Sequence, residues 1–364
     1  MENIYYWKDG QLQENKLRPL LRTNDLDHYQ DFELERHFII KDGRLTGVIP
    51  EMIPDISSRD FDTGMPAYIA IFSRGCPHGC TYCSNNKINK LYSFEKNIYR
   101  TKTVEGMIAE LKYILNKFSF IKCIYICDDN FLTNDTVFLE KFSRLYKKEI
   151  PVPFTIQGSS PYISEEKIRI LKGAGLKEIH IGVQSGSERI NENIYKRRVS
   201  KDTVIKAAGL IHKYNLRGRY DFIFDNPYEK IEDELETAKL ILDLPKPYIF
   251  QPFSLTFFPG TELYERAKRE GVIFNERIQV FEKVSNEFYP GNVTYLKLIC
   301  LLLPRLPHWL GSILICRPVV FLLHRHMFKG AYKQFYHLLC YFKSRFNISA
   351  RTLFRKRDIK LAVI

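Results

Sequence analysis

Apolar positions follow two alternating spacings between residue 67 and about residue 270. Short runs rich in β-branched and aromatic residues predict six strands, at 67–73, 122–127, 153–157, 178–183, 219–224 and 248–255. Apolar residues recur with the helical period at 104–117, 135–148, 165–174, 203–214, 232–242 and 262–269. Strict alternation of strand and helix predicts a parallel α/β sheet that closes as a barrel or a partial barrel, with its chemistry at the carboxyl ends of the strands.

The segments on either side of this pattern differ from it. Residues 1–66 contain four prolines and little periodicity, and 4–13 predict a short hairpin with its turn at Lys8-Asp9-Gly10. After residue 290, the apolar stretches 295–303 and 310–323 are shorter than the roughly 18 to 20 residues that a spanning helix needs. They fit either a helical domain packed on the barrel or segments lying in a membrane interface.

We therefore predict three parts: an N-terminal hairpin and linker at 1–66, a core domain at 67–275, and a basic, apolar, mainly helical C-terminal extension at 276–364. The predicted fold class is α/β, a partial (β/α)6 TIM-like barrel. Hydrophobic residues make up 45% of the chain and charged residues 27%, a composition that excludes a disordered or polytopic membrane chain.

Charge is distributed unevenly along the chain. The net charge is +13, but residues 290–364 hold 13 Lys and Arg against a single acid, Asp358, so this segment alone carries +12. An anionic partner is therefore expected at the extension rather than at the nearly neutral body. Because the basic residues alternate with apolar runs, a lipid surface is favoured and nucleic acid is disfavoured.

Three of the eight cysteines, Cys76, Cys80 and Cys83, lie close together just after the first predicted strand. Eight cysteines are too few for a disulfide scaffold, and the first residues lack a signal-peptide pattern, so a cytoplasmic location is expected. Three thiolates can hold three irons of a four-iron cluster and leave the fourth iron open to another ligand. Zinc with His78 as fourth ligand is the alternative, although structural zinc sites usually come as two separated ligand pairs.

This cysteine loop, placed after the first strand of six β/α units, resembles that of the radical S-adenosylmethionine (radical SAM) superfamily. Four more strand ends carry the resemblance. They are Asp128-Asp129-Asn130-Phe131, the stretch 180–188, the stretch 221–227, and Phe258-Pro259-Gly260-Thr261. The resemblance implies that Cys76, Cys80 and Cys83 bind a [4Fe-4S] cluster whose fourth iron is chelated by S-adenosylmethionine.

The resemblance also implies a set of cofactor contacts at the strand ends. Oxygens of the 128–130 run suit the methionine ammonium group, although such a run also caps helices. Asp225 stands where the family has glycine, which leaves that backbone contact open. The implied contacts are Tyr82, Asp128, Asp129, Asn130, Gln157, Gln184, Ser185, Glu188, Lys196 and Asp221.

The residue sequences of the Asp-Asp-Asn-Phe and Gln-Ser-Gly-Ser-Glu motifs most resemble those of one branch of the superfamily. The longer members of this branch carry an N-terminal cobalamin-binding domain. Residues 1–30 resemble the joint between that domain and the barrel, but no Asp-x-His-x-x-Gly stretch is present. Cobalt ligation by a domain in this chain is therefore not expected.

The resemblance implies an enzyme that reductively cleaves S-adenosylmethionine to a 5′-deoxyadenosyl radical, which abstracts a hydrogen from a substrate. A flavodoxin-like or ferredoxin-like protein would donate the electron. One alternative is a cobalamin-assisted radical SAM methyltransferase that works with a separate cobalamin-binding protein. The other is a non-catalytic membrane-surface adaptor that acts through the basic extension. That extension also suggests a peripheral position on the inner membrane surface and a lipid or lipid-linked substrate.

Overall fold

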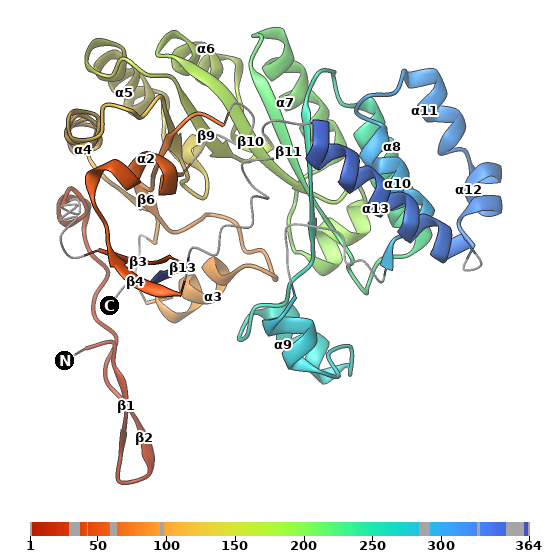
Figure 1. The fold of residues 1–364 in the computed structure, drawn as a ribbon, viewed down its shortest axis with the longest axis horizontal. Helices are drawn as coiled ribbons and strands as arrows, with labels where there is room; N and C mark the ends of the chain where they lie inside the picture. The colour runs from red at the N-terminus through yellow and green to blue at the C-terminus, as the bar shows by residue number, and fades with distance from the viewer. Residues whose placement is uncertain are drawn as a thin grey trace.

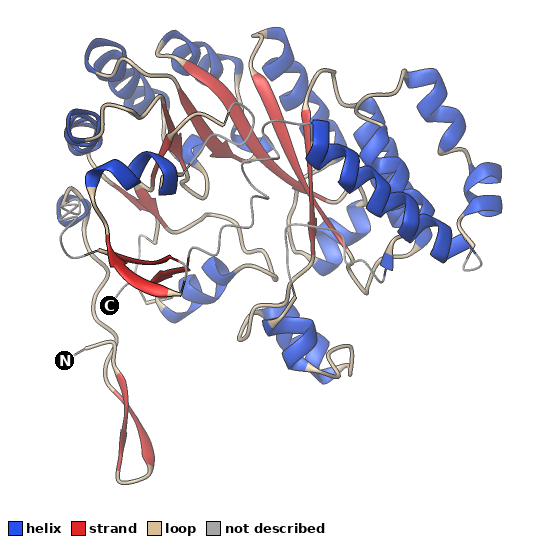
Figure 2. Cartoon of the chain, viewed as in Figure 1, coloured by secondary structure: helices blue, strands red, loops and turns tan. Residues whose placement is uncertain are grey.

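The structure is a computed structural model, and it describes residues 2–28, 37–41, 43–58, 64–94, 98–283, 292–325, 328–346 and 360–362. Its centre is a curved, six-stranded parallel sheet in the order β12-β11-β10-β9-β8-β5 (Figures 1 and 2). The strands are β5 (Ala67–Ala70), β8 (Cys123–Ile126), β9 (Phe154–Gly158), β10 (Leu176–Gln184), β11 (Arg217–Phe224) and β12 (Ile249–Ser254). The predicted partial barrel is confirmed.

Helices follow the strands, and all but the last of them cover the outer face of this sheet (Figure 1). They are α4 (Val104–Lys117), α5 (Thr136–Glu149), α6 (Glu165–Gly173), α7 (Lys201–Lys213), α8 (Ile231–Asp243) and α9 (Glu262–Arg269). Hydroxyl or carboxylate side chains accept hydrogen bonds at most of their N-termini, for example Thr103 before α4 and Ser164 before α6. Such caps satisfy backbone N–H groups that have no partner within the helix.

The two faces of the sheet differ in polarity. Ile126, Ile156 and Ile181 are fully buried against the helices. Residues of the opposite parity, such as Gln157 and His180, are polar and pair side by side in the strand register. Since successive side chains of a strand point to opposite faces, the apolar face forms the core and the polar face lines the inside of the barrel.

The N-terminal part contains more structure than the hairpin predicted for it. The hairpin itself is confirmed as β1 (Tyr5–Lys8) and β2 (Gln11–Glu14), followed by α1 (Thr23–Leu26). A second sheet joins β3 (Phe38–Lys41) and β4 (Arg44–Gly47) to β13 (Lys360–Ala362) from the far end of the chain, before α2 (Ile53–Ile56). The sequence analysis treated 37–47 as linker, so this sheet was missed.

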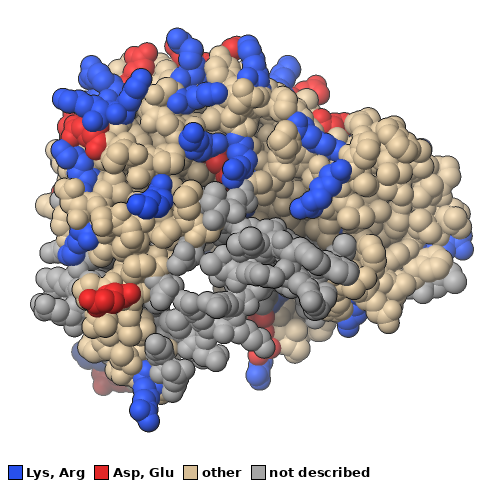
Figure 3. Space-filling view, turned by 45° about the horizontal axis from the view of Figure 1, so that its top comes forward, with Lys and Arg blue, Asp and Glu red and all other residues tan. Residues whose placement is uncertain are grey.

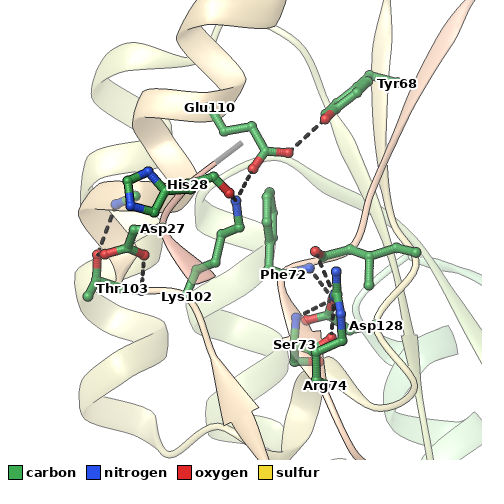
Figure 4. A network of polar contacts seen from close by, with 12 residues as sticks. Asp27, His28, Tyr68, Phe72, Ser73, Arg74, Lys102, Thr103, Glu110 and Asp128 are labelled. Atoms are coloured by element: carbon green, nitrogen blue, oxygen red, sulfur yellow. Dashed lines mark hydrogen bonds and ion pairs between the residues drawn. The ribbon is translucent and has the colours of Figure 1, made fainter. Parts of the chain in front are cut away.

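Polar contacts fasten the linker to the barrel (Figure 4). Asp27 accepts hydrogen bonds from the backbone N–H and the hydroxyl of Thr103, both at 2.8 Å. Lys102 Nζ donates to the backbone oxygen of His28 in the linker at 3.2 Å, and its buried ion pair with Glu110 at 2.5 Å holds it in place. These contacts hold the linker against the N-terminal end of α4.

The C-terminal segment forms α10 (Tyr295–Leu302), α11 (His308–Leu314), α12 (Arg317–Leu323) and α13 (Lys329–Phe346). Helix α10 packs against α8 and belongs to the main core, because Leu296 and Cys300 are at most 1% exposed. Helices α11 and α12 lie at the outer edge of the molecule (Figure 1). None of the described helices is long and apolar enough to cross a membrane.

Candidate functional site

The cysteine loop begins where β5 ends. The first predicted strand stops at Ala70, and Ser73–Arg74 instead form β6, which pairs antiparallel with β7 (Arg100–Thr101). Gly75 then turns the chain with φ +87°, and a Cβ atom there would lie 2.4 Å from Ile98 O. Glycine is therefore required at this turn. The loop ends at Cys83, immediately before α3 (Ser84–Leu91).

All three cysteines line one cavity of about 190 Å³ at the carboxyl ends of the strands. Five residues of the predicted cofactor set line the same cavity: Tyr82, Asp129, Gln157, Gln184 and Asp221. They come from the cysteine loop, the end of β8, and strands β9, β10 and β11. The fold thus gathers residues that are up to 145 positions apart in the sequence.

The other two members of the 128–130 run point elsewhere. Asp128 is fully buried, and its Oδ1 accepts hydrogen bonds from Phe72 N at 2.6 Å and Ser73 N at 3.0 Å (Figure 4). Burial raises the pKa of Asp128 to about 6. Asn130 Oδ1 accepts from Ser159 N at 3.2 Å. In this structure both side chains hold backbone segments that surround the cavity.

Three further predicted contacts lie outside the cavity lining. Ser185 is buried, and its hydroxyl lies 3.3 Å from Thr237 Oγ1 of α8. Glu188 is exposed, and Lys196 is exposed in an ion pair with Glu262. The adjacent Gly186 explains this packing, because a Cβ atom there would lie 2.5 Å from Thr237 Cα.

Arg197 is a cavity residue that the sequence analysis missed in favour of its neighbour Lys196. The Arg197 side chain is nearly buried, and its Nη1 donates to Cys80 Sγ at 3.7 Å. Its Nη2 donates to Ser159 Oγ at 3.0 Å and to Gly182 O at 2.8 Å. The guanidinium is thus fixed beside the Cys80 thiol at the wall of the cavity. The basic run 196–198 was the available signal.

The electrostatics of the thiols follow from their burial. Burial raises the pKa of Cys76 to about 11, while a backbone hydrogen bond at His78 lowers it. Burial also raises the pKa of Cys83, opposed by a backbone hydrogen bond at Asn85. Without a metal ion these thiols are protonated near neutral pH, so binding of iron would release protons.

The donor set fits an iron-sulfur cluster. Cys76, Cys80 and Cys83 are free thiols, and all three open onto the same cavity. Across the part of the chain that the structure describes, no three His, Cys, Asp or Glu side chains converge on one metal ion. A [4Fe-4S] cluster does not need such convergence, because each thiolate binds a different iron. His78 lines the cavity, and its buried Nε2 has no hydrogen-bond partner among the described residues.

Comparisons with known proteins agree with this site. The sequence model of the Radical SAM superfamily matches residues 70–241. The chain is 29% identical over 204 residues to an uncharacterized methyltransferase of Pyrococcus horikoshii, covering 56% of this chain and 42% of the relative. It is 24% identical over 222 residues to the bacteriochlorophyllide d C-8(2)-methyltransferase of Chlorobaculum tepidum, covering 59% and 47%. The chain spans less than half the length of these relatives.

Solved structures include two similar chains. The radical S-adenosylmethionine methyltransferase TsrM of Kitasatospora setae aligns with a TM-score of 0.48 and 13% identity, covering 58% of this chain and 41% of that one. The cobalamin-dependent S-adenosylmethionine radical enzyme OxsB aligns with a TM-score of 0.48 and 19% identity, covering 78% and 37%.

The fold and site define a class of protein: a partial parallel barrel with a three-cysteine loop at the carboxyl ends of its strands. The superfamily match runs from the end of β5 into α8 and includes all three cysteines. Residues 70–241 are therefore a radical SAM domain.

Proposed function

We propose that this chain is a radical SAM enzyme whose Cys76, Cys80 and Cys83 hold a [4Fe-4S] cluster. The observation that carries the proposal is the shared cavity of the three cysteines with Tyr82 and Asp129 at the strand ends. A cluster bound there, once reduced by an external one-electron donor, would supply the electron for cleavage of S-adenosylmethionine to methionine and a 5′-deoxyadenosyl radical, which would take a hydrogen atom from the substrate.

The chain's own residues bind and orient the cofactor. Asp129 offers a carboxylate to the methionine ammonium group, and Arg197 offers a guanidinium beside the thiolates. Gln184 ends β10 with φ +74°, after a register shift that follows Gly182, and its amide is available to ribose hydroxyls. Tyr82 packs edge-on against Tyr195 at 4.9 Å between ring centroids and forms an aromatic wall. Enclosure by these side chains excludes water from the reacting atoms.

The test is anaerobic reconstitution with iron and sulfide, followed by dithionite and S-adenosylmethionine, with 5′-deoxyadenosine measured by mass spectrometry. We expect deoxyadenosine from the unaltered chain and none from the Cys76→Ala/Cys80→Ala/Cys83→Ala variant. Cys316→Ala is the matched control, because Cys316 lies in the C-terminal helices. A folded chain that forms no cluster, or that makes equal deoxyadenosine without the three cysteines, contradicts the proposal.

A second candidate function is cobalamin-assisted methyl transfer. It is favoured by the relatives, which are named as methyltransferases. Methyl transfer to a reduced cobalamin converts S-adenosylmethionine to S-adenosylhomocysteine. Formation of S-adenosylhomocysteine that requires both added cobalamin and the three cysteines would support this function, and formation of deoxyadenosine alone would contradict it.

We also propose that the C-terminal helices contact an anionic lipid surface. Trp309 of α11 and Phe321 and Leu322 of α12 are 61% to 75% exposed, and 292–346 contains no acidic residue. Figure 3 shows that Lys and Arg gather over the helices at the left and top, whereas the right-hand end of the visible face is largely uncharged. Arg325 lies over the Phe321 ring, 5.3 Å from its centroid. Apolar side chains with such a basic neighbour are typical of helices that lie in a membrane interface.

Flotation with phosphatidylglycerol vesicles tests this contact, with phosphatidylcholine vesicles as the neutral comparison. We expect Trp309→Ala/Phe321→Ala to lose vesicle binding and Trp7→Ala to keep it, because Trp7 is 73% exposed on the N-terminal hairpin. Equal flotation of both variants would contradict the proposal. The non-catalytic adaptor becomes the better interpretation if vesicles bind the chain and no cluster forms in it. A flavodoxin-like or ferredoxin-like electron donor remains part of the proposed reaction.

A further inference from the structure

The inner face of the barrel is polar where it borders the cavity that the three cysteines line. Tyr125 of β8, Gln157 of β9, His180 of β10 and Asp221 of β11 lie on neighbouring strands. Gln157 is the register partner of His180, and Asp221 is the register partner of Gly182. Gln157, His180 and Asp221 line the same cavity as the cysteines. The polar lining therefore continues from the strand ends into the barrel.

Most of these polar groups already have partners within the protein. Gln157 Nε2 donates to the Tyr125 hydroxyl oxygen at 2.6 Å, and that hydroxyl lies 2.7 Å from His180 Nδ1. His180 Nε2 lies 2.5 Å from Glu178 Oε1, which also accepts from Arg219 Nε at 3.0 Å. If Nε2 of His180 carries the proton, the donors of Gln157, Tyr125 and His180 that face this network each meet an acceptor. The network fixes one wall of the cavity.

Asp221 is different from its neighbours. Within the described part of the chain its carboxylate forms no hydrogen bond or ion pair, and its Oδ1 is buried without a partner. Burial raises its pKa to about 7, opposed by the charge of Arg219. A buried acceptor without a donor is costly, so such groups call for a specific explanation, and an absent ligand is one. The Gln184 side chain lies beside Gly182, the register partner of Asp221, because a Cβ atom on Gly182 would lie 2.4 Å from Gln184 Nε2.

We propose that Asp221 anchors the substrate, by accepting a hydrogen bond from a protonated amine or a hydroxyl group next to the carbon that loses hydrogen. The Tyr125–His180–Glu178 network keeps the neighbouring wall in place and leaves Asp221 as the acceptor without a partner. This deepens the proposed function, because it assigns a class of substrate to the same cavity. The class is a molecule or head group that presents a hydrogen-bond donor, as opposed to a carboxylate or a purely apolar chain.

Three probes of equal length test the anchor in the chain before iron is added: propylamine, 1-propanol and propionate. Saturation-transfer NMR at mildly alkaline pH, where Asp221 is largely ionised, measures their binding. We expect propylamine to bind most tightly, 1-propanol more weakly and propionate not at all. Asp221→Asn should weaken propylamine binding about tenfold or more, the range expected for a lost hydrogen bond to a charged group.

Matched variants separate this effect from a general change in charge or folding. Asp202→Asn removes an exposed carboxylate from α7 and should change nothing. Asp221→Asn should fold, because it removes a buried charge without changing the side-chain volume, and circular dichroism checks this. The inference is overturned if neither propylamine nor 1-propanol binds, if propionate binds equally well, or if both variants behave alike. Tighter binding of 1-propanol than of propylamine would assign the hydroxyl as the substrate's donor and keep the anchor.

A second arm uses the reconstituted enzyme with carbon-deuterated propylamine. We expect deuterium in 5′-deoxyadenosine from the unaltered chain, and a smaller deuterated fraction in the deoxyadenosine that Asp221→Asn forms. If Asp221→Asn instead weakens S-adenosylmethionine binding, Asp221 holds the cofactor and the inference is overturned. If propylamine binds through Asp221 but no deoxyadenosine forms, the proposed reaction fails while the anchor stands.

Discussion

Removal of the Lys297 ammonium group tests how the C-terminal helices are joined to the barrel. Lys297 Nζ lies 2.6 Å from Asp225 Oδ1 and donates to Asn292 O at 2.9 Å. The side chains of Lys297 and Asp225 are only 1% and 3% exposed. Asp225 follows β11 with φ +57°, and its Oδ2 accepts from Ser254 Oγ at 2.7 Å. The ion pair therefore connects α10 to the carboxyl ends of β11 and β12.

We expect Lys297→Met to destabilise the protein by about 3 to 5 kcal/mol, because it leaves the Asp225 carboxylate buried without its counterion. For 364 residues, an unfolding entropy of about 2.1 cal/mol/K per residue amounts to about 0.76 kcal/mol/K. The midpoint of thermal unfolding should therefore fall by about 4 to 7 °C. Lys213→Met is the matched control. The side chains of its ion pair with Glu165 are 62% and 49% exposed, so its loss should cost less than about 1 kcal/mol.

Asp225→Gly completes a double-mutant cycle with Lys297→Met. Glycine adopts a positive φ without strain, but the single change leaves Lys297 buried beside Glu229 and Glu234, whose pKa values burial raises. With both charges removed, the combined loss should be smaller than the sum of the two single losses by at least about 1 kcal/mol. Urea denaturation of the four proteins at one pH measures these energies. Single losses that simply add, or a Lys297→Met protein as stable as the unaltered chain, would refute the reasoning.

Three other substitutions test the loop, the linker and the cavity. Gly75→Ala places a Cβ atom 2.4 Å from a backbone oxygen at φ +87°, so the reconstituted variant should bind less iron. The control Gly173→Ala should bind the full amount, because its Cβ meets nothing within 4 Å. Equal iron contents in the two variants would argue against a strained turn at Gly75. Asp27→Ala removes two hydrogen bonds to Thr103 and should weaken the attachment of the linker to the barrel by about 1 to 2 kcal/mol. Faster proteolysis of the N-terminal segment is the readout. An unchanged rate of cleavage would mean that other contacts hold the linker. The pKa of Asp221 is raised from 3.8 to about 7 in the folded state, so between these pH values the folded state keeps a proton that the unfolded state has lost. The stability of the unaltered chain relative to Asp221→Asn should therefore fall by at most about 4 kcal/mol as the pH rises from about 4 to 7. Urea titrations across this range check the sign, and a stability difference that is flat or rises with pH would contradict it.

The fold of the barrel was predictable because each element has one apolar face. Strands and helices of the sheet repeat that pattern locally, so periodicity located every one of them. The sheet of β3, β4 and β13 was not found, although 41–43 repeats the Lys-Asp-Gly signal of 8–10. Its third strand comes from 360–362, and pairing over such a separation leaves no local pattern. The first strand was predicted to reach Ser73 but ends at Ala70. Asp128 accepts hydrogen bonds from the backbone N–H groups of Phe72 and Ser73, and sequence periodicity does not reveal such a contact.

The site was predictable in its chemistry and less so in its geometry. Cysteine spacing predicted the three thiols that line one cavity, and five of the residues predicted at the strand ends line it with them. Which of two neighbouring polar residues faces the cavity depends on how the chain leaves its strand. Asp129 lines the cavity while Asp128 points to the backbone, and Arg197 lines it while Lys196 meets solvent. A change of one position reverses the direction of a side chain in extended structure, and a sequence motif does not specify this choice.

The structure also gives a reason for the residue that departs from the family's pattern. Glycine would serve at position 225 because φ is positive there. Asp225 accepts the strain of that conformation, and its carboxylate meets Lys297 from α10, a helix outside the matched region 70–241. Since a buried carboxylate is stable only with such a partner, Asp225 and α10 depend on each other. The C-terminal segment therefore has two parts with different environments. Helix α10 packs at the rim of the barrel, whereas α11 and α12 lie at the outer edge of the molecule with large apolar side chains exposed.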